Sequence, residues 1–451
     1  MSQANTTDSS LKSASEQVFN RVKDAGAEAD LIVMAAESLS LKASEGELEE
    51  YTVSNTQSYG VRVIKDDHVG IAYSEASDAD SLSWMVDQAL KNAAFSDAEP
   101  HERILDSQQH LVSDDSVFCP EDTASVDQHI EMVLQLESGL LEKPLIKSVP
   151  YNGVSDVANS RYLFTSAGLS AATRQRMVYA YAYALAEDGE KNAMEGTGQM
   201  SRLTHQLNVP ELIEAVASTS LDLLDGKPIP SKHYDVIFDR ECQIELFGVF
   251  SMVLSGKAAK EGINPWREKL GEVVADSRLN LSDKPLLMDG FGYALFDDEG
   301  TASADTNFIV EGKLNTMMHN SVTANHFGLT TTGHASRGSR STLGVGSHQL
   351  VIGAGAATAS EIYAGEYLEI TSMAGLHSGA NAISGDFSLG VSGFLCRDGM
   401  RIQPVRGVTV AGNFYKMLNQ INCIGDERFW NWQRTALMPS IRFADLAVSG
   451  E

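Results

Sequence analysis

Apolar residues recur at helical spacing in four segments of the first half of the chain. In each segment apolar side chains return every three or four positions, so they form one stripe along a helix. The stripes predict helices at about residues 11–25, 82–93, 126–141 and 212–224. Gly26 is suited to end the first helix, and Ser77 and Asp78 are suited to cap the second. The polar and acidic segment 96–124 is expected to be a long loop.

β-Branched and aromatic residues predict strands between these helices. Residues 29–37 form one such run, and residues 161–186 alternate between apolar and polar positions. Residues 59–65 and 68–73 flank the polar pair Asp66-Asp67, which is the pattern of a β-hairpin.

The second half of the chain is richer in short β-type runs and in glycine. It opens with the apolar run Tyr234–Phe238, a short buried strand, and a helical stripe follows at about residues 241–258. Beyond that point short β-type runs alternate with glycine turns. Of the 37 glycines, 11 lie in positions 1–230 and the other 26 lie later. Many short strands between turns are typical of a barrel or a sandwich.

A domain boundary is expected near Asp225–Ser231, which contains two prolines and a glycine. The sequence therefore predicts an α+β protein of two domains. Residues 1–228 would form an N-terminal α/β domain with antiparallel strands and helices. Residues 229–451 would form a C-terminal β-rich domain, barrel- or sandwich-like.

Composition narrows the classes of function. Among 451 residues there are 34 Lys and Arg against 61 Asp and Glu, a formal charge of −27. This balance argues against direct binding of nucleic acid or of an anionic membrane, which requires clustered basic residues. No apolar stretch is long enough to span a bilayer, and the first residues lack the pattern of a secretion signal. The four cysteines form no C-x-x-C pair, so we expect a protein of the reducing cytoplasm.

Histidines are the first candidates for metal chemistry. The only His-Glu pair is His101-Glu102. His110, the next histidine, would lie on the opposite side of a helix, so no H-E-x-x-H zinc motif is present. A later group contains His319, His326, His334 and His348. Their spacings of 7, 8 and 14 match no known ligand pattern, so ordinary polar histidines on a strand surface are favoured over a metal site.

Two further features carry weaker chemistry. Asp297-Asp298-Glu299 precedes Gly300, which indicates a tight turn whose carboxylates face solvent or cap nearby amides. A cation site there is less favoured, because consecutive side chains of an extended segment point to opposite faces. Cys242 opens a predicted helix, where a thiol pKa can fall, but no partner base is evident and a buried inert thiol is expected.

Several segments resemble the TldD/PmbA family, once described as modulators of DNA gyrase and now grouped with metallopeptidases. They are spread in order along nearly the whole chain: Ala29–Met34, Glu45–Glu49, Tyr59–Val63, Gly70–Tyr73, Leu295–Gly300, Gly328–Gly333 and Pro404–Gly412, followed by Asn413 and Met417-Leu418. The resemblance implies the same two-domain arrangement, with an α/β domain followed by a β-rich domain.

The resemblance also implies where a zinc site would lie. TldD-like subunits carry H-E-x-x-x-H on the first helix of the second domain and a later Cys as third ligand. In this sequence the matching helix, Glu241–Gly256, contains no His, and Asn431–Ser440 contains no Cys. Cys423 lies earlier and is not taken as a ligand. The chain therefore resembles the PmbA/TldE branch, and no catalytic, cofactor-binding or metal-binding residue is assigned to it.

The leading hypothesis is a PmbA/TldE-like subunit of a cytosolic zinc metallopeptidase that cleaves or matures peptides and unfolded protein segments. Its partner would be a TldD-like catalytic subunit, and zinc is expected in that partner and not in this chain. One alternative is a stand-alone metallopeptidase that uses the group of His319, His326, His334 and His348 with Asp297–Glu299. Another is an acidic regulatory protein of DNA gyrase. The sequence leaves open the stoichiometry and whether the chain forms a homodimer when alone.

Overall fold

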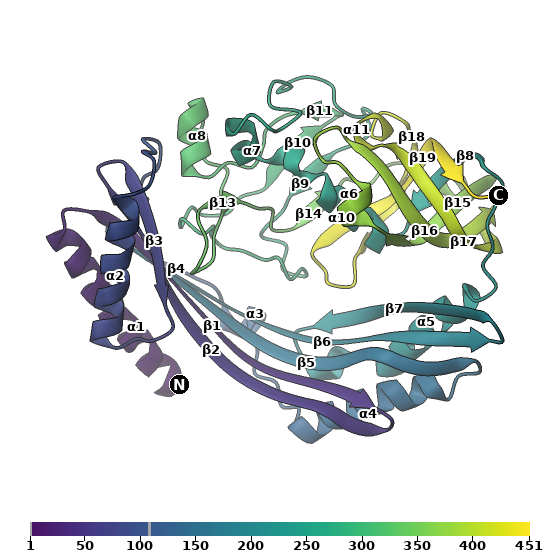
Figure 1. Ribbon diagram of the computed structural model, residues 1–451, viewed down its shortest axis with the longest axis horizontal. Coiled ribbons are helices and arrows are strands. Elements are labelled where there is room, and N and C mark those ends of the chain that lie inside the picture. The colour runs from purple at the N-terminus through teal and green to yellow at the C-terminus, as the bar shows by residue number, and fades with distance from the viewer. Residues whose placement is uncertain (1, 107–109) are drawn as a thin grey trace.

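The computed structural model describes residues 2–106 and 110–451, with side chains from residue 10 onward. Its first half is built on a long, strongly curved sheet (Figure 1). Among the described residues this sheet has seven strands, in the order β3-β2-β1-β5-β6-β4, with β7 paired to β6. Their bounds are β1 (Glu28–Ser44), β2 (Glu47–Lys65), β3 (His68–Ser74), β4 (His110–Val112), β5 (Ile146–Thr165), β6 (Ser170–Asp188) and β7 (Lys191–Ser201). All pairs are antiparallel except β4 with β6.

Helices cover the sheet at its two ends (Figure 1). Those of the first half are α1 (Ser2–Asp24), α2 (Ala79–Ala93), α3 (Asp115–Phe118), α4 (Val126–Leu141) and α5 (Val209–Asp222). Helices α1 and α2 bury one apolar cluster against β1–β3, while α4 and α5 bury a second against β1, β5, β6 and β7. Each cluster is the amphipathic stripe that the spacing of apolar residues predicts.

Local chemistry explains where these elements begin and turn. The Asp78 carboxylate accepts the Ser81 backbone N–H at 3.0 Å and caps α2. Asp66 and Asp67 take positive φ angles of 51° and 64°, which suits the short β2–β3 hairpin turn. The predicted loop 96–124 is partly wrong, because it contains β4 and α3. A three-residue strand and a single helical turn are too short to leave a periodic signal.

The second half is a mixed sheet whose last part closes on itself. Its strands are β8 (Lys232–Phe238), β9 (Leu281–Asp283), β10 (Thr306–Val310), β11 (Lys313–Leu314), β12 (Ala335–Ser336), β13 (Gly344–Val345), β14 (Leu350–Ile352), β15 (Glu366–Ala374), β16 (Asp386–Arg397), β17 (Met400–Asn413), β18 (Ile421–Trp430) and β19 (Ala436–Ser449). The path β19-β17-β16-β15-β8 is closed because β8 also pairs with β19. This ring confirms the predicted β-rich, barrel-like second domain.

Short helices decorate this domain. They are α6 (Arg240–Val249), α7 (Gly256–Lys260), α8 (Ser321–Phe327), α9 (Ala359–Ile362), α10 (Leu376–Gly379) and α11 (Phe414–Met417). The single helix predicted at about 241–258 is wrong in length: α6 ends at Val249, a 3₁₀ turn follows over Ser251–Leu254, and Ser255 caps α7. Apolar residues keep a spacing of three or four through this break, so the pattern could not reveal it.

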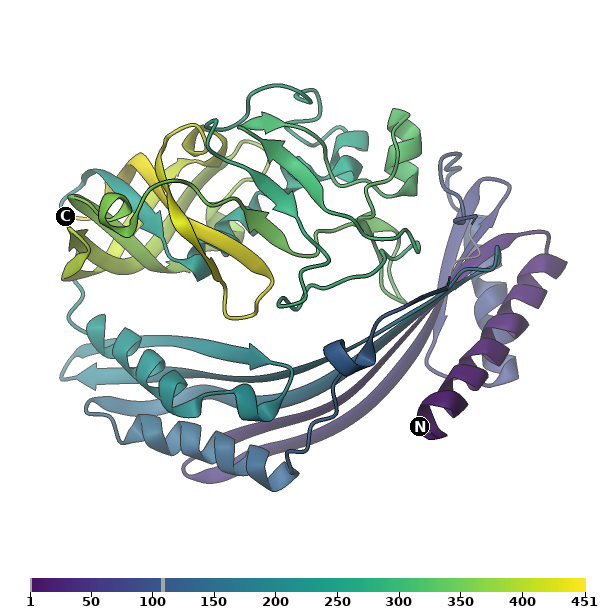
Figure 2. The ribbon, with the colours of Figure 1, turned by 180° about the vertical axis from the view of Figure 1, so that it is seen from behind.

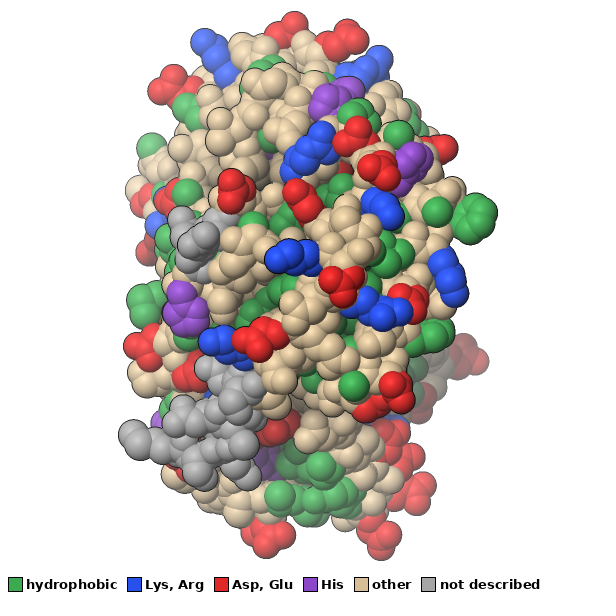
Figure 3. Space-filling view, turned by 90° about the vertical axis from the view of Figure 1, so that its left-hand side faces the viewer, with side chains coloured by type: hydrophobic (Ala, Val, Ile, Leu, Met, Phe, Trp, Pro, Cys, Tyr) green, Lys and Arg blue, Asp and Glu red, His purple; other side chains and the backbone are tan. Residues whose placement is uncertain are grey.

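The two halves contact one another at both ends of the curved sheet, and its concave face is turned toward the barrel (Figure 2). The segment between α5 and β8 connects them, and Lys227 makes backbone hydrogen bonds with Pro404 and Arg406 of β17. On the end of the molecule shown in Figure 3, acidic and basic side chains are interspersed over much of the surface. Within the described residues no helix is both long and apolar enough to cross a membrane.

Candidate functional site

The first turn of α6 lies between the barrel and the curved sheet. Strand β8 packs into the core of the second domain and ends at Phe238. The next residue is Asp239, whose carboxylate accepts the Cys242 backbone N–H at 2.8 Å. This cap starts α6 and places Glu241 and Glu245 one turn apart. Both glutamates are close enough to Tyr183 of β6 to raise the pKa of its hydroxyl, after the larger effect of burial.

The pKa values of several carboxyl groups in this region are shifted toward neutral pH. Burial raises the pKa of Asp239 to about 6 and that of Glu241 to about 7. Burial also raises the pKa of Glu195, on β7 of the first domain, to about 7. Glu241 Oε1 accepts the Trp432 backbone N–H at 2.8 Å, which fixes its position. Groups with such pKa values can exchange protons near neutral pH.

The donors on α6 do not fit a catalytic zinc ion. Zinc sites of peptidases use imidazole nitrogens and one carboxylate. Helix α6 has no imidazole, and its thiol, Cys242, is kept protonated because burial, and then Asp239, raise its pKa well above the usual value. Burial also raises the pKa values of Asp239 and Glu241, which disfavours the charged form that a metal ion requires. Helix α6 therefore does not supply the ligands of a catalytic zinc ion.

Two of the four clustered histidines converge on one carboxylate. His334 Nε2 lies 3.0 Å from Asp283 Oδ2, and His348 Nδ1 lies 2.8 Å from the same oxygen. Within the described part of the chain this is the only group of three or more His, Cys, Asp or Glu donors with metal-like spacing, all within 4.8 Å. Its hydrogen bonds already use the carboxylate fully, because Asp283 also accepts the backbone N–H groups of His348 and Gln349.

The other two histidines lie apart from this group. His319 Nδ1 contacts Thr323 Oγ1 at 3.1 Å, and burial lowers its pKa to about 4, so the ring is neutral. His326 is exposed, and its ring packs edge-on against His101 at 5.4 Å between centroids. Asp283 was not singled out from the sequence. The signal that could have found it is an acid at the end of a buried strand.

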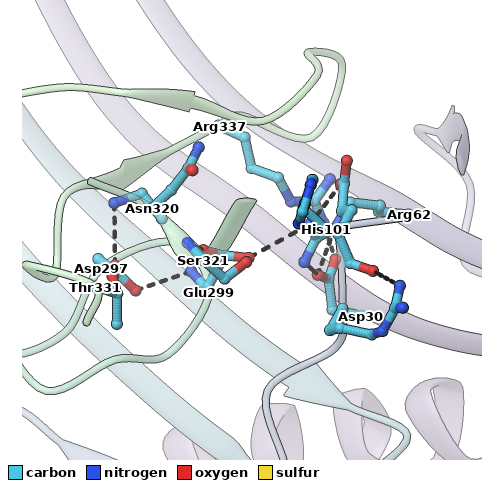
Figure 4. Close-up of polar contacts among 12 residues, drawn as sticks. Asp30, Arg62, His101, Asp297, Glu299, Asn320, Ser321, Thr331 and Arg337 are labelled. Atoms are coloured by element: carbon cyan, nitrogen blue, oxygen red, sulfur yellow. Dashed lines mark hydrogen bonds and ion pairs between the residues drawn. The ribbon is translucent and has the colours of Figure 1, made fainter. Parts of the chain in front are cut away.

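The acidic run before Gly300 is a buried turn (Figure 4). Gly300 has a φ of +88°, and Asp297 accepts backbone N–H groups from Glu299, Thr301 and Ala335. Glu299 accepts the Ser321 N–H at 2.8 Å. The expectation that these acids cap nearby amides is confirmed, while the expectation that they face solvent is wrong. Their oxygens accept backbone N–H groups and pair with Arg62 and Arg161, and they do not meet the four clustered histidines.

A buried network of charges joins this turn to the first domain (Figure 4). Arg62 of β2 donates through Nε to Asp30 Oδ2 at 2.8 Å and through Nη1 to Glu102 at 2.7 Å. Arg62 also lies 3.5 Å from Glu299, and Arg337 pairs with Asp30. Four of these five side chains are at most 2% exposed. The sequence did not predict this network. Its ion pairs hold the two domains together, and we assign it a structural role.

Comparisons with known proteins agree with this architecture. Three family models match the chain: PmbA/TldA metallopeptidase domain 1 over residues 29–93, the central domain over 119–224 and the C-terminal domain over 231–450. Metalloprotease PmbA of Escherichia coli O157:H7 is 24% identical over 418 residues, covering 88% of this chain and 87% of that protein. A metalloprotease of Methanothermobacter thermautotrophicus is also 24% identical and covers 88% of both chains.

Two solved structures share the fold. A putative modulator of a DNA gyrase from Thermotoga maritima superposes with a TM-score of 0.87 at 23% identity, covering 97% of this chain and 100% of that one. TldE from Thermococcus kodakarensis gives a TM-score of 0.84 at 20% identity with the same coverage. At these identities the structures support the fold alone.

Proposed function

The chain belongs to the PmbA/TldD family of metallopeptidase-related proteins, and we propose that it is a PmbA/TldE-type subunit without a catalytic metal of its own. In this proposal a TldD-like partner supplies the zinc, and the pair cleaves or matures peptides and unfolded protein segments. The observation that carries the proposal is the first turn of α6, where carboxyl and thiol groups occupy the helix on which TldD-like subunits are expected to carry imidazoles.

The close contact between the two domains supports a role in enclosing the substrate. Trp432 packs over Gly198 of β7 so closely that a Cβ on Gly198 would lie 2.9 Å from the indole ring. An extended peptide can hydrogen-bond to a strand, whereas close contact between the domains would exclude a folded substrate. Enclosure also removes water and strengthens polar interactions with the bound chain.

The carboxyl groups near the first turn of α6 would form hydrogen bonds with the bound peptide. With pKa values near 7, Glu195 and Glu241 can donate or accept a proton when they meet the amide groups of a peptide. In this proposal they position the substrate and do not attack it.

The test compares the chain alone with the chain mixed with a TldD-like subunit. We expect the pure chain to cleave no unstructured peptide with or without added zinc, and the mixture to cleave it in a zinc-dependent manner. A partner whose H-E-x-x-x-H histidines are replaced is the matched control. Zinc-dependent cleavage by the pure single chain would contradict the proposal.

A cytoplasmic location is part of the proposal. Its support is that all four cysteines are free, which suits a reducing compartment. The net charge of −27 supports the absence of direct contact with nucleic acid.

A stand-alone metallopeptidase is the second candidate, favoured by the convergence of Asp283, His334 and His348. Elemental analysis of the purified chain distinguishes it from the first candidate. One equivalent of a transition metal that is lost on His348→Ala would favour the stand-alone enzyme.

A further inference from the structure

Two arginines share a pocket at the end of β7 without a carboxylate partner. The pocket has a volume of about 440 Å³ and lies between the domains, lined by Arg202 and Pro120 from the first and by Met288, Phe291 and Arg434 from the second. Within the described residues neither guanidinium has an acidic group within 4.0 Å. In a chain of net charge −27, two unpaired arginines side by side are unexpected.

The guanidinium of Arg202 is held in place before any ligand arrives. Its Nη2 donates to the carbonyl oxygens of Met288 at 3.2 Å and Gly290 at 3.1 Å. Its charged end also lies 4.6 Å from the centroid of the Phe291 ring and 5.2 Å from that of Phe118. Among the described residues these contacts leave Nε and Nη1 without an acceptor, so both groups are available to an anion.

Arg434 is the less satisfied of the two. Its Nε is buried and has no hydrogen-bond partner, which is costly for a charged donor. Its backbone has a φ of +52°, a left-handed conformation that glycine would adopt more easily. Asn431 fixes this turn by accepting the N–H groups of Thr435 and Ala436 at 2.9 Å each. The turn thus holds an arginine where its own conformation does not favour one.

The guanidiniums of Arg202 and Arg434 repel one another. Burial, and then the charge of Arg434, lower the pKa of Arg202. Asp289 is the acidic residue of the pocket wall, and its charge acts on Arg202 from beyond ion-pair distance. A bound carboxylate would relieve the repulsion and could accept two parallel N–H donors from either guanidinium.

We propose that Arg202 and Arg434 form a binding site for the C-terminal carboxylate of an extended peptide. The inference rests on the proposed function in so far as peptides are the substrate. Glu195 and Gly198 lie on β7, and Arg202 follows Ser201, the last residue of that strand, so the pocket lies at the end of β7. A peptide anchored here would reach Glu195 after about seven extended residues, at about 3.3 Å per residue. The apolar lining of Met288 and Phe291 suits an apolar terminal side chain.

The test measures peptide binding by fluorescence anisotropy, using the full chain without partner or zinc. The probe is a labelled unstructured peptide ending in leucine, with either a free carboxylate or a C-terminal amide. We expect the free acid to bind at least tenfold more tightly than the amide. Arg202→Gln and Arg434→Gln should each abolish this difference, while Arg267→Gln, at an exposed arginine elsewhere, should preserve it.

Two more variants sharpen the result. Asp289→Asn should tighten binding of the free acid, because it removes the competing negative charge from the pocket wall. Equal binding of acid and amide by the unaltered chain would overturn the inference, as would an amidated peptide with a terminal glutamate that binds as tightly as the free acid. Since no cleavage is measured, these outcomes are independent of whether the proposed partner activity exists.

Discussion

Arg62 of β2 and Glu299 of the second domain lie 3.5 Å apart, with side chains only 1% and 2% exposed. Arg62 also pairs with Asp30 and Glu102 of its own domain, and Glu299 also accepts the Ser321 N–H of its own domain. The acids around Arg62 hold its pKa above the usual value in spite of burial, so the guanidinium stays charged. The pair therefore couples the stability of each domain to the docking of the other.

Replacing Arg62 tests this coupling. Arg62→Ala removes the arginine partner of the buried acids Glu102 and Glu299 and leaves Asp30 with Arg337 alone. We expect a loss of about 3–5 kcal/mol in the free energy of unfolding, measured by urea denaturation. Arg21→Ala removes the exposed pair with Asp87 and should leave the midpoint nearly unchanged. Similar midpoints for the two variants would show that the buried network does not stabilise the docked domains.

The raised pKa of Glu241 predicts how stability depends on pH. The folded pKa of about 7 is above the ordinary value of 4.5, so between these two pH values the folded state binds more protons than the unfolded state. This group therefore favours folding at low pH and loses that contribution as pH rises through 7. Glu241→Gln keeps an oxygen for the Trp432 N–H and removes the titration. We expect it to raise the thermal midpoint at pH 8 and to have little effect at pH 4.5.

Glu361 is the control of opposite sign. Hydrogen bonds from Thr358 lower its pKa, so its contribution is present above its unfolded pKa and is lost in acid. Glu361→Gln should reduce stability at pH 8. If both variants shifted the midpoint in the same direction at pH 8, the assignment of Glu241 would be wrong.

The Asp283 group gives a prediction about metal. Burial alone would raise the pKa of Asp283, but hydrogen bonds from His334 and His348 outweigh it and hold the pKa well below the usual value. The carboxylate therefore stays charged and binds the two rings without an ion. We expect dialysis against a chelator, or addition of zinc, to leave the thermal midpoint unchanged. A zinc-dependent rise that His348→Ala abolishes and His326→Ala preserves would contradict this expectation.

Cysteine alkylation tests the packing of α6. Cys242 and Cys396 are buried, whereas Cys119 and Cys423 are partly exposed. Burial also raises the pKa of Cys242, which reduces the reactive thiolate. Mass spectrometry after iodoacetamide treatment of the native chain should find Cys119 and Cys423 modified well before Cys242. Early modification of Cys242 would show that the first turn of α6 opens to solvent.

Local patterns in the sequence predicted the elements that local interactions define. The β2–β3 hairpin follows from β-branched runs around a polar turn, and α4 follows from the helical spacing of its apolar residues. The charge network did not follow, because its members lie far apart in sequence and meet only in the folded chain. The sequence holds one sign of the network, because Asp30 and Arg62 each interrupt an otherwise apolar strand segment. The pocket arginines leave no such trace, since Arg202 and Arg434 stand in ordinary polar surroundings.

The closure of the second-domain barrel orders events during synthesis. Val236 of β8 pairs with Phe443 of β19, so the first strand of the ring lacks one neighbour until almost the entire remaining chain has been made. The curved sheet of the first half contains no strand later than β7 and can assemble much earlier on the ribosome. The first domain can therefore be folded while β8 still waits for β19 to close the ring.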